Sequence, residues 1–442
     1  MSFSYYFYER ITMNRRAFWW DIDESLEPSK TYELPKQSDF VIVGGGYTGL
    51  SAGLTIARQG KSVVVLDSGK PGLGASTRNG GICSGQIRLS HSSLCHRFSK
   101  EFADEVYLEG VEARFDLSKF CLEENIDCQL KMSGRFTGAM SEADYNKQSK
   151  ESERLNKLDG HKTSMVSKAD QHNEISTDLF FGGMLREEIG GFHPGKFFAG
   201  LLKCSEGAGV NIISDTPVLE IKDISEGKKS VVTKRGSIST GKVIVATNAY
   251  TGTKHRVGKF LRRRLVPAQS AIIVTEKLGV DRVKEMMPKL RMYGNTANLY
   301  SYFRPTPDHD RILLGSRGFD KLEATDRTVK YLKQKLSLIF PDLLECKIEY
   351  CWQGNVGFTR TQLPVIFEYN DIYYAAGYAG SGTVWARWMG KKVAETAMRT
   401  ANKPSIFYGE PPKSIPFYDG NPWFLPSIQY YYALKDWLKF RH

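Results

Sequence analysis

Two short apolar runs near the N-terminus flank a segment with the spacing of a helix. Residues 40–43 and 62–66 form almost continuous apolar runs, as expected of strands buried on both faces. Between them, apolar residues recur through positions 50–57 at helical intervals, and Gly60 ends that pattern. The pattern predicts a strand, a helix and a second strand within residues 39–67.

Three glycines and one acid give this unit its candidate chemistry. Gly44, Gly46 and Gly49 have G-x-G-x-x-G spacing directly after the first strand, and Asp67 ends the second strand. The first glycine permits a tight turn, the second lets the backbone approach a pyrophosphate, and the third lets the helix pack on the strand. The helix N-terminus offers N–H groups to the phosphates, while Asp67 can accept the ribose hydroxyls and would repel a 2′-phosphate. A glycine triplet alone is weak evidence, but with both strands and the terminal acid it predicts a dinucleotide site.

A second glycine-rich loop follows at residues 72–81, with Arg78 near its centre. Its small residues would let the backbone lie close to a phosphate or a flat ring, and Arg78 could donate to phosphate or ring oxygens. An ordinary surface loop is the alternative for this stretch taken alone. A strand and glycine loop at 372–382 then opens a helix predicted over 383–400, which puts another helix N-terminus where it can face a ligand.

The rest of the chain divides into helical and alternating segments. Helices are predicted over 100–124, in the charged stretch 141–172, from 195 to 207 and near 325–340. Shorter strands are predicted at 210–213, 218–221, 231–233 and from Lys242, and longer alternating ones at 271–275, 299–304 and 311–315. From residue 265 to 348 we therefore expect a mostly antiparallel second domain. Residues 1–37, which hold Trp19 and Trp20, are expected to form an arm over the body.

Length and charge narrow the classes of protein that fit. At 442 residues the chain exceeds one ordinary core, so two domains are expected. The net charge of +12 would suit an anionic substrate, an acidic partner or a membrane surface. No recognised nucleic-acid module is present, which argues against nucleic acid as a partner. Much of the excess charge is local and is expected to form a solvated basic face, in Lys254, Arg256, Lys259, Arg262, Arg263 and Arg264.

Cysteine usage and hydropathy bear on location. Seven cysteines are scattered without C-x-x-C spacing, which indicates reduced thiols rather than disulfides or a zinc site. The N-terminal stretch mixes charges with aromatics and lacks the apolar core of a signal peptide. No stretch reaches the roughly 18 uncharged apolar residues of a spanning helix. We expect a cytoplasmic protein without a metal centre, for which peripheral membrane contact is a minor alternative.

A single dinucleotide fingerprint with a suitably spaced acid occurs in the chain. A separate site for a nicotinamide coenzyme is therefore not expected. One fingerprint with two further glycine loops fits a cofactor that is itself the redox agent, which favours a flavin over a nicotinamide.

Four segments together resemble a known family. VIVGGGYTGLSAGL, GLGASTRNGG, ATNAYT and YYAAGYAGSGT resemble the D-amino-acid oxidase superfamily of FAD enzymes, most of all its gamma-glutamylputrescine oxidase and aminophosphonate oxidoreductase branch. The resemblance implies an α/β fold in which an FAD-binding Rossmann-like domain of the glutathione-reductase type is interleaved with an α+β substrate domain carrying a large, mostly antiparallel sheet. We assign 38–125, 190–260 and 351–402 to the FAD-binding domain, 126–189 and 261–350 to the substrate domain, and 403–442 to a C-terminal tail.

The resemblance also implies which residues contact FAD. They come from the fingerprint, from the second glycine loop, from the strand beside the adenine, from a strand end beside the flavin, and from the late glycine loop near the O2 edge of the ring. The residues implied are Gly44, Gly46, Thr48, Gly49, Asp67, Ser68, Ala75, Ser76, Arg78, Asn79, Gly80, Gly81, Val218, Thr247, Gly377, Gly380, Ser381, Gly382 and Thr383.

The chain departs from the family's pattern at three points. Ser381 stands where histidine is common in the late loop. The cysteine that binds flavin covalently in sarcosine oxidase relatives would fall near Val356 or Gly357, and since neither can form a thioether, FAD is expected to be non-covalent. The lysine that those relatives use to activate oxygen has no counterpart in residues 311–315, so O2 and another electron acceptor both stay open.

The resemblance implies oxidation of the C–N bond of an amine or amino acid by hydride transfer to flavin N5, giving an imine that water hydrolyses to a carbonyl compound. Tyr300, Tyr302 and Arg304 would share one face of the predicted strand, because side chains alternate along a strand. We expect the tyrosines to line the substrate pocket and Arg304 to pair with an acidic group of the substrate. The alternative is that this face packs on the sheet.

Other residues and other functions stay open. His193, before a proline, is expected to be a structural turn residue, and Trp352 and Gln353 are candidate pocket-wall residues. One alternative function is a dehydrogenase for aminophosphonates or secondary amines that passes electrons to a quinone or carrier protein. Another is a partner-binding or membrane-associated flavoprotein without turnover, suggested by the aromatic, basic tail 430–442. A helix docked on the body is the favoured interpretation of that tail.

Overall fold

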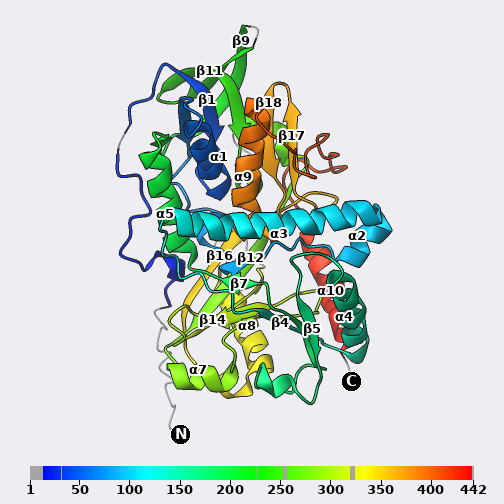
Figure 1. The fold of residues 1–442 in the computed structure, drawn as a ribbon. Helices are drawn as coiled ribbons and strands as arrows, with labels where there is room; N and C mark the ends of the chain where they lie inside the picture. The colour runs from blue at the N-terminus through cyan, green and yellow to red at the C-terminus, as the bar shows by residue number, and fades with distance from the viewer. Residues whose placement is uncertain (1–12, 31, 226, 252–255, 319–323, 441–442) are drawn as a thin grey trace.

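The computed structural model describes residues 13–30, 32–225, 227–251, 256–318 and 324–440. One large sheet occupies the upper half of Figure 1 and a second the lower half, and the long helix α3 (Lys100–Glu123) lies across the level between them. In the basic cluster predicted from the sequence, Lys254 and the side chain of Arg256 lie outside the described residues.

The upper sheet is built around the two strands predicted from the first apolar runs. In spatial order its strands are β17 (Val365–Tyr369), β18 (Ile372–Ala376), β11 (Gly236–Val245), β1 (Gln37–Val43), β2 (Val63–Leu66) and β8 (Asn211–Ile213), and a hairpin of β9 (Val218–Ser225) and β10 (Lys228–Thr233) extends from β11. From β18 to β8 all neighbours are parallel. Parallel strands need cover on both faces, which explains why β2 is buried along its whole length.

Helices cover one face of this sheet. They are α1 (Tyr47–Ala57), α5 (Pro194–Gly207) and α9 (Gly382–Met398), and α3 packs across α9. Glycines let the elements approach closely: a side-chain carbon at Gly390 would lie 2.3 Å from the Thr48 carbonyl oxygen, and one at Gly49 would lie 1.8 Å from that of Gly44. The third glycine of the fingerprint therefore has the packing role that its spacing predicts.

The lower sheet is mostly antiparallel, as the alternating segments predict. Its order is β16 (Ile348–Phe358), β12 (Val266–Thr275), β15 (Ile312–Arg317), β14 (Tyr302–Pro305), β13 (Met292–Asn295), β4 (Arg135–Gly138), β6 (Gly183–Arg186) and β5 (Thr163–Val166). The one parallel pair among these strands is β13 with β4. An apolar core under the sheet, with Phe136, Phe303 and Leu336 fully buried, is covered by α8 (Asp326–Ile339) and α7 (Val280–Met286).

Smaller elements connect the two sheets and cover their edges. They are the strand pair β3 (Ile82–Cys83) and β7 (Gly190–Gly191), and the helices α2 (His91–Arg97), α4 (Glu142–Leu155), α6 (Lys259–Arg262) and α10 (Leu425–Lys439). Throughout the part of the chain that is described, no helix combines the length and apolar character needed to cross a bilayer.

Three segments differ from their sequence-based boundaries. The strand predicted at 299–304 begins only at Tyr302, because the residues before it form a loop. The charged stretch 141–172 is helical only over α4, after which the chain forms β5 and pairs with β6. β16 pairs with β12 along its whole length, so the domain boundary drawn at residues 350/351 cuts through a strand of the lower sheet.

The described part of the N-terminal arm lies over the body. Trp19 is fully buried. Its ring packs edge-on against Trp352 of β16 and against His193, which precedes α5. Its indole N–H donates to the Asn79 carbonyl at 2.7 Å, and the Trp20 N–H donates to the Thr77 hydroxyl at 2.8 Å. The arm therefore fastens the second glycine loop.

We predict that Gly49→Ala lowers the free energy of unfolding by at least about 3 kcal/mol, the upper end of the usual cost of overpacking. The added methyl group would overlap the Gly44 backbone, which cannot move without opening the strand-to-helix turn. Thermal and urea unfolding of the FAD-loaded protein measure the effect. Gly207→Ala is the control, because no atom lies within 4 Å of its added carbon; equal effects of the two substitutions would refute the packing role.

Candidate active site

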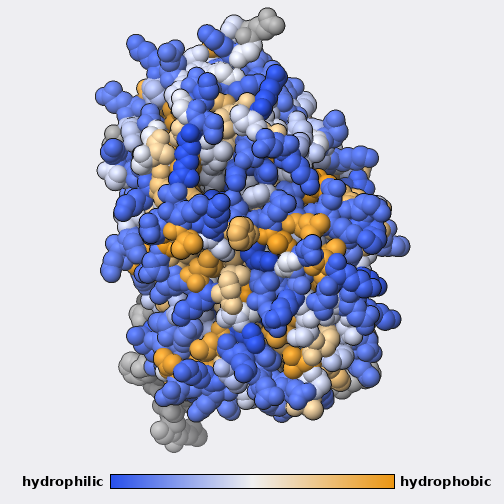
Figure 2. Space-filling view, in the orientation of Figure 1, coloured by the Kyte–Doolittle hydropathy of each residue, from blue (hydrophilic) through white to orange (hydrophobic). Residues whose placement is uncertain are grey.

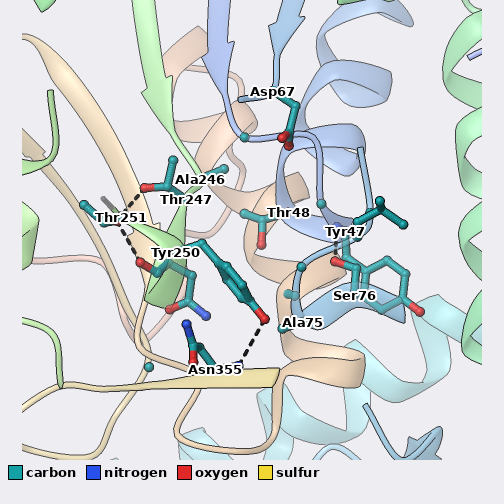
Figure 3. Close-up of a pocket in the computed structure, with 18 of the residues that line it drawn as sticks. Tyr47, Thr48, Asp67, Ala75, Ser76, Ala246, Thr247, Tyr250, Thr251 and Asn355 are labelled. Atoms are coloured by element: carbon teal, nitrogen blue, oxygen red, sulfur yellow. Dashed lines mark hydrogen bonds between the residues drawn. The ribbon is translucent and has the colours of Figure 1, made fainter. Parts of the chain in front are cut away.

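A cavity of about 680 Å³ opens at the carboxyl ends of β1, β2 and β11. We call it the cofactor cavity; its volume falls within the range of roughly 300–1,000 Å³ typical of ligand sites. Open α/β sheets bind ligands at this edge, beyond the ends of the strands. Figure 3 shows its lining, with Asp67 and Thr48 on one side and Thr247 and Tyr250 on the other.

The fingerprint turn fits a phosphate group. Gly44 has φ +106°, which L side chains rarely adopt, and a side-chain carbon at Gly46 would lie 2.8 Å from the Ser76 hydroxyl oxygen. Ser76 accepts the N–H of Tyr47 at 2.9 Å, so the second loop is fastened to the start of α1. The first turn of α1 contains no acidic residue and no side-chain cap, which leaves its positive end to a ligand.

Asp67 lies where the fingerprint predicts. Its two carboxylate oxygens accept the N–H groups of Gly45 at 2.7 Å and Gly69 at 3.0 Å. These bonds use two of about four lone-pair sites, which leaves acceptors for ribose hydroxyls. Burial is the main influence on this carboxyl and raises its pKa above the usual value.

Most residues implied to contact FAD line this cavity, namely Gly44, Gly46, Thr48, Asp67, Ser68, Ala75, Ser76, Asn79, Val218, Thr247, Gly380, Gly382 and Thr383. Arg78, Gly80 and Ser381 line only a second cavity next to it. Gly49, Gly81 and Gly377 line neither and have backbone roles: Gly377 has φ +85° and donates its N–H to the Asn248 side chain at 3.0 Å.

Tyr250 was not singled out by the sequence, although it belongs to the quoted segment ATNAYT. Its ring projects into the cofactor cavity in Figure 3, and its hydroxyl accepts the N–H of Asn355 on β16 at 3.0 Å. Thr251, from the same segment, lines the cavity and bonds Thr247 at 2.6 Å between hydroxyls. The polar residues directly after β11 were the sequence signal for this part of the cavity. Of them, only Thr247 was identified from the sequence.

The second cavity, of about 340 Å³, adjoins the first. We call it the substrate cavity. Ala75, Asn79 and Gly380 are among the residues that line both cavities. A group bound at the junction would therefore face both cavities at once.

Tyr300 and Tyr302 both line the second cavity. Tyr302 pairs with Gly315 in the sheet register. A side-chain carbon at Gly315 would lie 2.2 Å from the Tyr302 ring, and one at Gly80 would lie 2.6 Å from it. The ring is therefore held between Gly80 of the second glycine loop and Gly315 of β15. Its hydroxyl lies 3.3 Å from that of Ser270, and its ring stacks with Tyr300 at a centroid distance of 6.1 Å.

Three further arginines line the substrate cavity: Arg88, Arg135 and Arg317. Among the residues that the structure describes, no acidic side chain lines this cavity and none of the three arginines forms an ion pair. Burial is the main influence on Arg135 and Arg317 and lowers the pKa of each to about 10, so both stay charged at neutral pH. The Nε of Arg135 is buried without a hydrogen-bond partner among the described groups.

Arg304 does not have the expected position. Only 4% of it is exposed, it lines neither cavity, and its guanidinium donates to the carbonyls of Pro305, Gly81 and Phe192 at 2.8 to 3.0 Å. This corrects the expectation that Arg304 holds the substrate, because its donors are used by the backbone. Arg304 follows Tyr302 at the spacing of two within β14, but its guanidinium reaches the carbonyls of Gly81 and Phe192 and not the cavity.

His193 and β16 residues have structural positions. His193 caps α5 by accepting the N–H of Lys196 at 3.2 Å, as a turn residue would. Trp352 donates to the Arg78 carbonyl at 3.0 Å, and the Gln353 carbonyl accepts the Arg78 guanidinium at 3.2 Å. Neither lines a cavity, so both hold the second glycine loop instead of forming the pocket wall.

A family model described as FAD dependent oxidoreductase (DAO) matches residues 39–396. Because the match spans most of the chain, the chain belongs to that family of oxidoreductases, and FAD is its cofactor. The cavity fits this cofactor, since glycine turns, a helix N-terminus and a buried acid converge on it. The family, fold class and cofactor predicted from the sequence are thus confirmed.

Known proteins support the same assignment. The gamma-glutamylputrescine oxidoreductase of Escherichia coli (strain K12) is 29% identical over 406 residues, covering 90% of this chain and 92% of that protein. The crystal structure of glycine oxidase from Geobacillus kaustophilus has a TM-score of 0.70 at 21% identity, covering 83% of this chain and 96% of that one. L-proline dehydrogenase from P. horikoshii has a TM-score of 0.69 at 21% identity, covering 84% and 96%. These two structures establish the fold.

We predict that FAD affinity falls as the pH is lowered and that Asp67 is the cause. Its raised pKa means that it takes up a proton at a higher pH than an exposed aspartate, and the neutral acid loses charge-assisted hydrogen bonds. Asp67→Ala should weaken FAD binding by roughly 10- to 150-fold, since such a bond is worth about 1.5–3 kcal/mol. Fluorescence titration of apoprotein with FAD measures both effects. Asp39→Ala, an exposed residue of β1 outside the cavity, should leave them unchanged.

Proposed function

We propose that this enzyme oxidises the C–N bond of an amine or amino acid that carries an acidic group. When bound, FAD supplies the chemistry by accepting a hydride from the carbon next to the nitrogen. The observation behind the proposal is the substrate cavity: it adjoins the cofactor cavity and brings together three arginines without an acidic partner among the described residues. The E. coli relative, named for gamma-glutamylputrescine, supports an amine as the substrate.

The arginines select for an anion. A buried cation without a counter-ion is costly, so a carboxylate or phosphonate that enters the cavity supplies the missing charge. Arg135 and Tyr300 both lie against Gly294. A side-chain carbon at Gly294 would be 2.9 Å from the Arg135 guanidinium and 2.6 Å from the Tyr300 hydroxyl. Arg317 pairs with Ser270 in the register and is next to Tyr302 in space. The planar forks of these arginines suit bidentate binding of an acid group.

The positive charges of the cavity also favour the neutral form of the substrate amine. Hydride loss from the α-carbon requires a neutral amine, and a positive, partly buried cavity disfavours the ammonium form. The aromatic rings of Tyr300 and Tyr302 add apolar surface that reduces hydration of the amine. No acidic side chain lines the cavity to stabilise the ammonium, so the described residues favour proton release to solvent.

The junction between the cavities favours negative charge. Helix α9 begins at Gly382 without a side-chain cap and without an acid in its first turn, so its N–H groups remain available. Gly382 and Thr383 line the cofactor cavity there. This is where the cofactor would gain electrons, and a positive helix end lowers the cost of that step.

We predict that Arg317→Met raises the KM for an anionic amine by at least about tenfold, equivalent to roughly 1.4 kcal/mol of lost binding. The KM for a neutral amine of similar size should scarcely change, because it makes no ion pair with the guanidinium. Anaerobic bleaching of the flavin by a panel of carboxylate, phosphonate and neutral amines measures turnover whichever electron acceptor the enzyme uses.

Arg360→Met is the matched control, since Arg360 is exposed and lines neither cavity. It should leave both KM values unchanged. Equal losses for anionic and neutral amines with Arg317→Met, at full FAD content, would contradict an anionic substrate.

We also propose that FAD is held without a covalent bond. No cysteine or histidine lines either cavity in the described part of the chain, and Val356 and Gly357 line the cofactor cavity where a cysteine would be needed. We predict that trichloroacetic acid releases the flavin into the supernatant. Flavin that stays with the precipitated protein in an absorbance spectrum would show a covalent link.

A further inference from the structure

Helix α10 turns its polar side toward the protein. The residues of its half-buried stripe recur at intervals of three and four, as Leu425, Gln429, Tyr432, Asp436 and Lys439. Asp436 accepts the N–H groups of Asn298 and Leu299, each at 2.8 Å, and the Asn298 side-chain amide at 2.7 Å. Gln429 donates to the Gly318 carbonyl at 3.3 Å, and Lys439 pairs with Asp144 of α4.

The opposite side of α10 is apolar and aromatic. Its exposed residues include Tyr430 at 74%, Tyr431 at 58%, Leu434 at 42% and Leu438 at 59%, and no residue of the helix is buried. Trp423, just before the helix, is 65% exposed. A contiguous exposed apolar face of this kind normally marks an interaction surface.

This arrangement inverts the usual surface helix, which buries its apolar side and exposes its polar side. Packing α10 the other way round would bury several large side chains in the body, yet the hydrogen bonds of Asp436 hold the polar stripe inward. The outer face is therefore left uncovered by the part of the chain that the structure describes.

The composition of the outer face fits a lipid surface. Tyrosine and tryptophan with leucine are the residues enriched where membranes meet water. Asp436, the single acid within α10, is turned inward and bound by N–H groups, while Lys435 is exposed beside the apolar face. The face thus carries no negative charge, and the chain as a whole has a net charge of +12. A basic, acid-free aromatic face matches anionic lipid headgroups.

We propose that α10 lies flat on the surface of an anionic membrane, with Tyr430, Tyr431, Leu434 and Leu438 in the headgroup region. The proposal concerns attachment alone and stands apart from the reaction proposed above. A second copy of the chain is the competing occupant of this face.

Sedimentation with vesicles tests the proposal on the full-length, FAD-loaded protein. We expect it to pellet with vesicles of phosphatidylcholine and phosphatidylglycerol, and to stay in solution with phosphatidylcholine alone. The double variant Leu434→Ser/Leu438→Ser should bind the anionic vesicles at least about tenfold more weakly, because partitioning scales with apolar area. It should keep its FAD and its rate of amine oxidation, since neither residue lines a cavity.

Phe115→Ser on α3 is the control, because Phe115 is 68% exposed and lies on another helix. It should leave vesicle binding unchanged. The proposal is overturned if the wild-type protein does not pellet, or if the double variant pellets as well as the wild type. It is also overturned if analytical ultracentrifugation shows that the wild-type protein is a dimer and the double variant a monomer, while neither protein binds vesicles.

Discussion

Three indole N–H groups hold the glycine loop at residues 72–81, and both cavities depend on that hold. Trp19 and Trp352 donate to the carbonyls of Asn79 and Arg78, and Trp20 donates to the Thr77 hydroxyl. Buried carbonyls that lose a donor cost about 1–3 kcal/mol each, so the loop has one favoured path. That path places Ala75 and Asn79 at the wall shared by the two cavities.

Charge determines what the second cavity can accept. Arginines come from the loop after β3, from β4 and from the end of β15, and all three line one cavity. Burial is the main cause that lowers the pKa of Arg317, and the neighbouring charge of Arg88 lowers it further. Buried guanidinium groups without an acidic partner among the described residues make this cavity favourable for a negatively charged group.

Features built from residues close together in the sequence could be predicted, whereas those assembled from distant segments could not. The fingerprint, the buried strands and the helices after them depend on residues within about 30 positions of one another, and Asp67, Ser76 and Thr247 were found at the cavity as expected. Arg88, Arg135 and Arg317 could not be grouped from the sequence, because a loop and two strands far apart in the chain meet only in the folded protein. Arg304 was misplaced because alternation along a strand gives the face of a side chain but not its partners: its guanidinium donates to the distant carbonyls of Gly81 and Phe192.

The two ends of the described chain both reach the catalytic region. Trp19 and Trp20 fasten the glycine loop near the N-terminal end, whereas Gly382 opens α9 and Asp436 fixes the loop that precedes Tyr300. Strands of each sheet alternate along the chain, so neither sheet is finished until most of the sequence is available. The βαβ unit supplies the first part of the cofactor cavity, and the start of α9, near the other end of the described chain, supplies the last. A chain cut before α9 would therefore lack part of the lining that the cofactor needs, even if the early strands had paired.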